Sequence, residues 1–103
     1  MKLIRDVPVD EQPARIEAAI DLRIEALRDN PGLVTVMPGP GQLVVLRAMN
    51  EHGPMSVADI CRVVGERTVQ PVISRLAGLA VRGLVERTGD GRWRAIPKAK
   101  AVA

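Results

Sequence analysis

The stretch that decides the fold, residues 56–82, reads "SVADICRVVGERTVQPVISRLAGLAVR". Its first ten residues have the apolar spacing of a short amphipathic helix, with Ser56 as the predicted N-cap and Asp59 three positions later in the first turn. Gly65 is predicted to end that helix, and a new helical pattern begins at the next cap candidate, Thr68. Two helices joined by a short turn that opens at a glycine are typical of a helix-turn-helix.

The second of these helices contains a proline and a glycine. Pro71 falls in the first turn, where backbone N–H groups have no partner within the helix, so it is tolerated there. With Leu76 at the centre of the buried face, a step of 100° per residue places Ser74 and Gly78 on the opposite face. A mid-helix glycine costs about 1 kcal/mol relative to alanine. Gly78 either lets DNA or another helix approach closely, or has no such role. The predicted buried face consists of Val69, Val72, Ile73, Leu76, Leu79 and Ala80, and Gly83 is the predicted left-handed C-cap.

Two more helices are predicted upstream. The first, residues 13–30, has Pro13 in its first turn and stops at Asn30-Pro31-Gly32. The second begins near Pro40 and ends at "EHGP". The apolar positions of the first are Ile16, Ala19, Ile20, Ile24 and Leu27, and those of the second are Leu43, Val45, Leu46 and Met49. The first helix carries more apolar surface than a lone helix can bury. It therefore packs on its own domain or mediates a homodimer through Ile16, Ile20, Ile24 and Leu27.

Downstream, "LVERTGDGRWRAI" at residues 84–96 contains two short extended runs around a glycine-rich turn, which predicts a β-hairpin. The chain has no Phe or Tyr, and its one Trp, Trp93, stands between Arg92 and Arg94. Alternation along a strand puts Trp93 on one face and the two arginines on the other. We therefore expect Trp93 to be buried near Leu79 and Leu84, and the arginines to point away.

These elements define the predicted fold class: mainly α with a small β-hairpin (α+β), a winged helix-turn-helix preceded by an N-terminal amphipathic helix. Residues 1–38 are interpreted as an arm plus that helix, a candidate dimerisation element. Residues 39–97 form the winged helix-turn-helix, and residues 98–103 form a flexible tail. A chain of 103 residues has room for one small domain.

Charge is unevenly distributed along the chain. The net charge of the whole chain is +3, but residues 62–103 carry nine Lys/Arg against three Asp/Glu. A basic segment of this kind indicates a polyanionic partner, or simply a soluble basic tail.

A single His (His52, interpreted as a loop residue) and a single Cys (Cys61, interpreted as a small core residue) give no catalytic or zinc-binding pattern. We therefore expect no enzyme activity, no metal and no cofactor. No apolar run is long enough for a transmembrane helix, and we expect a cytoplasmic protein without a membrane partner.

The residues of the predicted helix-turn-helix and hairpin resemble those of a known group of proteins. "PGQLVVLRAMNEHGPMSVADICRVVG", followed by "VISRLAGLAVRGLVER", looks like the winged helix-turn-helix of MarR-type transcription regulators. The hairpin "GLVERTGDGRWRA" is also similar to the wing of IclR-type regulators. The resemblance implies a small prokaryotic or phage regulator, a repressor, that binds double-stranded DNA as a homodimer. MarR-type proteins continue after the wing into further helices, whereas this sequence ends at "PKAKAVA", so it gives no basis for predicting a small-molecule effector.

In a winged helix bound to DNA, the N-terminal part of the helix over residues 68–82 enters the major groove. Gln70 is then suited to adenine and Arg75 to guanine, while Ser74 contacts a base or a phosphate. Phosphate contacts are expected from the helix N-terminus and from the arginines of the wing. The predicted DNA-binding residues are Arg67, Thr68, Gln70, Ser74, Arg75, Arg87, Arg92 and Arg94. Two alternatives remain: a winged helix used for protein–protein interaction, and a phage excisionase or other DNA-bending protein.

Overall fold

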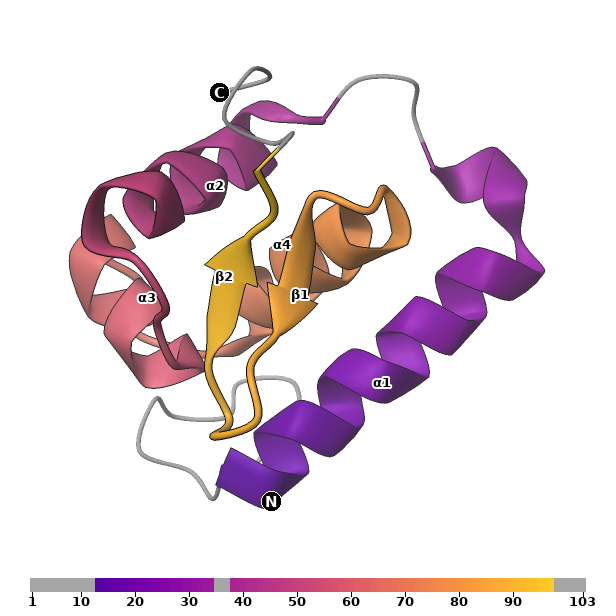
Figure 1. The fold of residues 1–103 in the computed structure, drawn as a ribbon. Coiled ribbons are helices and arrows are strands. Elements are labelled where there is room, and N and C mark those ends of the chain that lie inside the picture. Colours follow the sequence, from indigo (N-terminus) through magenta and orange to yellow (C-terminus); the bar gives the residue numbers. More distant parts are fainter. Residues whose placement is uncertain (1–12, 35–37, 98–103) are drawn as a thin grey trace.

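The computed structural model describes residues 13–34 and 38–97 (Figure 1). It is mainly helical and carries one small antiparallel hairpin, which confirms the predicted α+β composition. The arm before Pro13 and the tail at residues 98–103 lie outside the described residues. The elements in chain order are α1 (Pro13–Asp29), the 3-10 helix η2 (Pro31–Leu33), α2 (Pro40–His52), α3 (Val57–Val64), α4 (Gln70–Val81), β1 (Val85–Arg87) and β2 (Trp93–Ala95).

The ends of α3 follow the local sequence signals. The Ser56 hydroxyl accepts a hydrogen bond from the Asp59 backbone N–H at 3.2 Å, and the Asp59 carboxylate accepts one from the Ser56 N–H at 3.4 Å. This reciprocal capping satisfies two N–H groups that have no partner within the helix. At the other end Gly65 adopts a left-handed conformation with φ 81°, as predicted.

The C-terminus of α4 is also as predicted. Gly83 has φ 73°, a conformation that glycine adopts without steric cost. Its N–H donates to the Ala80 carbonyl, and the next N–H, of Leu84, donates to the Leu79 carbonyl, both at 3.0 Å. This pair of bonds is a Schellman motif, and it directs the chain from α4 straight into β1.

The N-terminus of α4 differs from the prediction. Its N-cap is Val69, which makes no side-chain capping bond, so the expectation that Thr68 caps the helix was wrong. Five residues, 65–69, separate α3 from α4. The Thr68 carbonyl instead accepts a hydrogen bond from the Cys61 thiol at 3.6 Å. Pro71 lies in the first turn of α4, as predicted.

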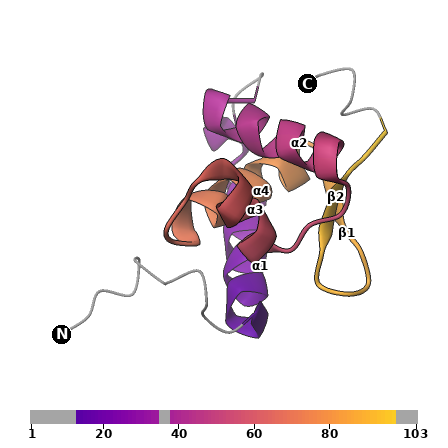
Figure 2. The same ribbon diagram turned by 90° about the vertical axis from the view of Figure 1, so that its left-hand side faces the viewer.

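Helix α4 is the centre of the fold. It lies between α1 on one side and α2 on the other (Figures 1 and 2), and it also contacts α3 and β1. The buried side of α1 packs along α4, so the structure shows the first of the two roles expected for α1: packing on its own domain. Buried side chains from the helices and the hairpin form one core. Three expected members, Ala19, Leu43 and Ala80, are only half-buried, while Ala48 and Ala77 are buried.

The hairpin pairs Val85 with Ala95, Glu86 with Arg94, and Arg87 with Trp93. The segment between α2 and α3 also pairs with this hairpin. The Met55 N–H donates to the Trp93 carbonyl at 2.9 Å, and the Trp93 N–H donates to the Met55 carbonyl at 2.8 Å. The strand that carries the tryptophan is therefore bonded on both edges.

Within residues 13–34 and 38–97, none of the helices combines the length and the apolar character needed to cross a membrane.

Candidate nucleic-acid interface

The N-terminal half of α4 presents polar side chains on its outer side. Arg67 and Ser74 are exposed, and Thr68 and Gln70 are partly exposed. Gln70 and Ser74 stand four positions apart and are therefore neighbours on the helix surface. Thus four of the five DNA-binding residues predicted on or next to α4 lie at an accessible surface around the start of this helix.

Arg75 lies against α2 instead. A Cβ added to Gly41 would stand only 2.6 Å from the Arg75 Nε, so the arginine crosses α2 where glycine leaves room for it. Its Nη1 is 3.5 Å from the Glu66 carboxylate, and about a third of its side chain is exposed. Arg75 therefore packs within the chain. To read guanine, as predicted, it would have to leave these contacts.

Gly78 is buried, so its predicted position on a solvent-facing surface was wrong. A Cβ added here would stand 2.5 Å from the Gln42 Nε2. Of the partners proposed to approach Gly78, the structure shows another helix: the Gln42 side chain of α2 lies against it. Gly78 is buried because α1 and α2 cover α4 on two sides, which makes the buried sector of α4 wider than the apolar pattern indicates.

Arg87 is tied to α1. Its Nε and Nη1 donate to the Glu17 and Asp21 carboxylates, each at 2.7 Å, and its Nη2 donates to the Glu17 carbonyl at 3.2 Å. The Arg87 Cζ also lies 4.7 Å from the centroid of the Trp93 ring, a cation–π distance. Burial acts to lower the pKa of Arg87, but the hydrogen bonds to Glu17 and Asp21 outweigh it and raise that pKa. The structure thus gives Arg87 a role in joining hairpin and helix, and the phosphate contact expected of it stays a prediction.

Arg92 and Arg94 are more exposed than Arg87, at 54% and 57% of the side chain. Arg94 donates to Glu86 across the hairpin at 2.7 Å, and Arg92 lies 3.7 Å from Asp90 in the turn. Exposed ion pairs of this kind contribute about 0–1 kcal/mol. Both guanidinium groups can therefore exchange a carboxylate for a phosphate at little cost.

Trp93 is buried, with 2% of its surface exposed, and Arg94 beside it is exposed, as strand alternation predicted. Its Nε1 donates to the Glu17 Oε2 at 3.2 Å. Glu17 was not among the residues predicted from the sequence. The one available signal was its position next to Ile16 and four residues before Asp21, on the flank of the apolar face of α1.

The four candidate dimerisation residues of α1 are buried within the chain itself. Their exposed fractions run from 0% to 9%, and they belong to the core that α1 shares with α4. A dimer interface built from these side chains would require α1 to leave α4. The four residues are Ile16, Ile20, Ile24 and Leu27.

Cys61 is buried, as expected of a core residue. Burial, followed by the nearby Glu66 carboxylate, raises the pKa of its thiol against the smaller lowering effects of Arg62 and Arg75. It is therefore a protonated thiol at neutral pH. Throughout the described part of the chain, no three His, Cys, Asp or Glu side chains are grouped so that they could hold a metal ion.

The model of the HVO_A0114 family matches residues 40–100, more than half of the chain and a region that includes α2, α3, α4 and the hairpin. No curated protein and no solved structure matches the chain.

Proposed function

The chain belongs to the HVO_A0114 family, and we propose that it binds double-stranded DNA as a winged helix-turn-helix, with α4 in the major groove. The observation that carries the proposal is the arrangement at the start of α4. The helix follows α3 after a short turn, its inner side fills the core, and Arg67, Gln70 and Ser74 remain accessible on its outer side. An accessible polar helix surface beside a short hairpin is the geometry that such domains use to reach base edges.

The contacts divide into two groups. Gln70 and Ser74 are suited to base edges in the groove, because an amide can bond adenine in bidentate fashion and a hydroxyl can bond either base or phosphate. Arg67 and Thr68 next to the helix N-terminus, and Arg92 and Arg94 on the hairpin, are suited to phosphate. Arg75 and Arg87 are assigned to the support of this surface, through α2 and α1 respectively.

The biological role proposed with this activity is that of a small prokaryotic or phage transcription regulator that represses by occupying its operator. The MarR-type resemblance of the sequence supports this role. If the protein binds a palindromic site as a homodimer, its interface must use a surface other than the inner face of α1, because that face is buried against α4.

Selection of bound sequences from a random duplex pool tests the proposal, followed by fluorescence anisotropy across a salt series. We expect an enriched sequence and tight binding that weakens as salt rises. Arg67→Ala should weaken binding and reduce the slope of log K against log salt by about 0.9 if one phosphate contact is lost. Arg28→Ala, on the exposed last turn of α1, is the matched control and should change neither quantity. Binding without sequence enrichment, or an equal loss in both variants, would refute the proposal.

A second candidate is a protein-interaction module, and one observation favours it. Each arginine of the hairpin has a carboxylate within 4 Å: Arg87 with Glu17, Arg92 with Asp90, and Arg94 with Glu86. The hairpin therefore presents less unneutralised charge than its sequence suggests. This candidate predicts weak DNA binding that does not change when Arg92 and Arg94 are replaced together by alanine.

A further inference from the structure

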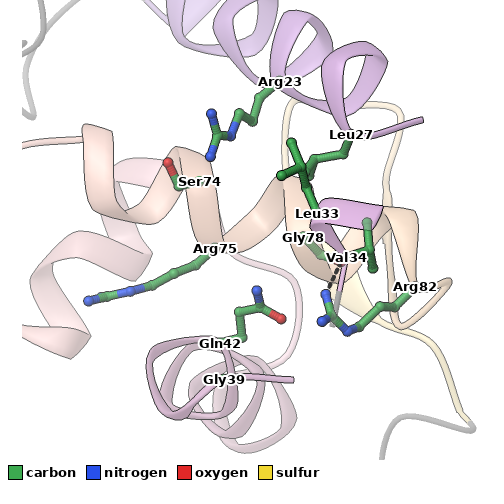
Figure 3. A pocket seen from close by; sticks show the side chains of 10 residues that line it. All are labelled: Arg23, Leu27, Leu33, Val34, Gly39, Gln42, Ser74, Arg75, Gly78 and Arg82. Carbon is green, nitrogen blue, oxygen red and sulfur yellow. Dashed lines mark hydrogen bonds between the residues drawn. The ribbon is translucent and has the colours of Figure 1, made fainter. Parts of the chain in front are cut away.

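Helix α1 has two flanks of opposite character. Towards the hairpin it carries Glu17 and Asp21, which bind Arg87. Towards the outer side of α4 it carries Arg23, whose side chain reaches from α1 to the side on which Ser74 lies (Figure 3). Arg23 and Ser74 line the same hollow beside α4. The arginine of α1 and the proposed groove-contacting hydroxyl of α4 therefore lie on one accessible surface.

No acidic side chain of α1 lies near Arg23 on the surface of the helix. The four acidic residues of α1 stand two or six positions from Arg23, which a step of about 100° per residue converts into about 120–160° around the helix. Its surface neighbours Ala19 and Ala26, four positions before it and three after it, are small and uncharged. Among the described residues that line the hollow there is no Asp or Glu. A phosphate can therefore approach Arg23 without meeting a carboxylate of α1 or of the hollow.

Arg23 is also exposed and without a bonding partner. It forms no ion pair or hydrogen bond within residues 13–34 and 38–97. The arginines of the hairpin differ in this respect, because each has a carboxylate within 4 Å. Arg23 thus gives up no intramolecular bond when it binds an anion, and its guanidinium group matches the geometry of a phosphate.

The dimensions of DNA place α1 beside a phosphate backbone when α4 lies in the major groove. The groove is about 12 Å wide, and a helix with its side chains is about 10–12 Å across, so the groove admits α4 alone. The axes of packed helices are about 8–10 Å apart. Since α1 packs along α4, it remains outside the groove, next to one of the two backbones that border it.

We propose that α1 is a second DNA-contacting helix, in which Arg23 holds a phosphate at the border of the groove that α4 occupies. This inference rests on the proposed DNA binding and adds a contact from an element outside the helix-turn-helix and the hairpin. The contacting surface then runs from Arg67 through Gln70 and Ser74 to Arg23. Because phosphates carry no base information, the contact of Arg23 contributes affinity and not sequence preference.

Arg23 and Arg28 provide a matched pair of variants. Both are exposed arginines of α1 without a carboxylate partner in the described part of the chain, but about 140° around the helix separates them. Binding is measured by fluorescence anisotropy across a salt series, on the duplex enriched by selection and on a scrambled duplex. Arg23→Ala should weaken binding to both duplexes by about tenfold and reduce the salt slope by about 0.9, whereas Arg28→Ala should change neither. Arg23→Lys should keep the slope, because the charge is retained.

Neutral methylphosphonate groups, placed one at a time along the enriched duplex, locate the contact. At one position that borders the groove, this replacement should weaken binding of the native protein by about tenfold and leave binding of Arg23→Ala nearly unchanged. Such coupling identifies a direct contact. If Arg23→Ala acted only by disturbing the packing of α1, each methylphosphonate would have the same effect on the variant as on the native protein.

The outcomes separate this inference from the proposed function. If Arg67→Ala weakens binding but Arg23→Ala behaves like Arg28→Ala, then α4 binds DNA and α1 does not, and only this inference is overturned. The absence of coupling at every methylphosphonate position overturns it as well. If the native protein retains no duplex, the proposed function and this inference are both refuted.

Discussion

Glu17 on α1 accepts a hydrogen bond from the indole N–H of Trp93 on β2, although 76 positions separate them in the chain. The other oxygen of the same carboxylate accepts from Arg87 on β1. Both strands of the hairpin are thus fastened to α1 through one side chain. Apolar burial alone would have left the position of the hairpin less well determined, because the hydrophobic effect is not directional.

Replacing Glu17 should therefore destabilise the fold. Glu17→Ala leaves the Trp93 N–H without its partner and removes one of the two carboxylates of Arg87. We expect a loss of about 1–3 kcal/mol in the free energy of unfolding, measured by urea denaturation. Glu25→Ala, at an exposed position of the same helix, should change it by less than about 0.5 kcal/mol. Equal effects of the two variants would show that the Glu17 bonds contribute nothing specific.

Trp93 should behave as a fully buried indole. Its emission maximum is expected at short wavelength in the native protein, with little quenching by acrylamide, and should move to longer wavelength on unfolding. Trp93→Ala should cost about 3–5 kcal/mol, the range for loss of a large buried aromatic side chain. A native emission maximum typical of indole in water would contradict the burial of Trp93.

The contact between Gly78 and Gln42 predicts non-additive mutations. Gly78→Ala would ordinarily stabilise a helix by about 1 kcal/mol, but here the new methyl group displaces the Gln42 amide. We expect little or no gain from this change alone and a clear gain when Gln42 is already alanine. Thermal melts of the two single variants and the double variant measure the coupling, which should reach about 0.5 kcal/mol or more. Simple additivity would mean that Gln42 moves away at no cost.

Cys61 predicts a loss of stability at alkaline pH. Burial, with a smaller contribution from Glu66, raises the pKa of its thiol in the folded state. The thiol contribution to stability is therefore fully present below the ordinary thiol pKa of about 8.5 and is lost as pH rises above it, because the unfolded chain ionises first. Urea midpoints of the native protein should fall more between about pH 7.5 and pH 9.5 than those of Cys61→Ala. Parallel curves would contradict a raised pKa.

Local signals made much of the fold predictable. Ser56 with Asp59, Gly65 and Gly83 mark helix ends through bonds made within a few residues, and the glycine-rich turn at 89–91 marks the hairpin in the same way. The start of α4 was less well predicted. A hydroxyl at Thr68 favours a cap, but the backbone there is held by Cys61 on the preceding helix, and that tertiary bond is not visible in the local pattern.

The candidate interface was predictable only as a set of residue types. Periodicity assigns faces to a helix, but it does not say how many neighbours will cover them. Gly78 was misplaced because two helices flank α4, and the packing role of Arg75 depends on the absence of a side chain at Gly41. The pairing of Arg87 with Glu17 is a long-range relationship that no spacing rule contains.

The Glu17–Trp93 bond also bears on how the protein reaches its native state. Helices α2, α3 and α4 are consecutive and make contacts that are short in sequence, whereas α1 must find a hairpin at the far end of the chain. Closing so long a loop has an entropic cost before any contact can compensate for it. We therefore expect α1 to dock last, onto a helical core that has already formed. The arrival of α1 would appear as the slowest change in tryptophan emission during refolding.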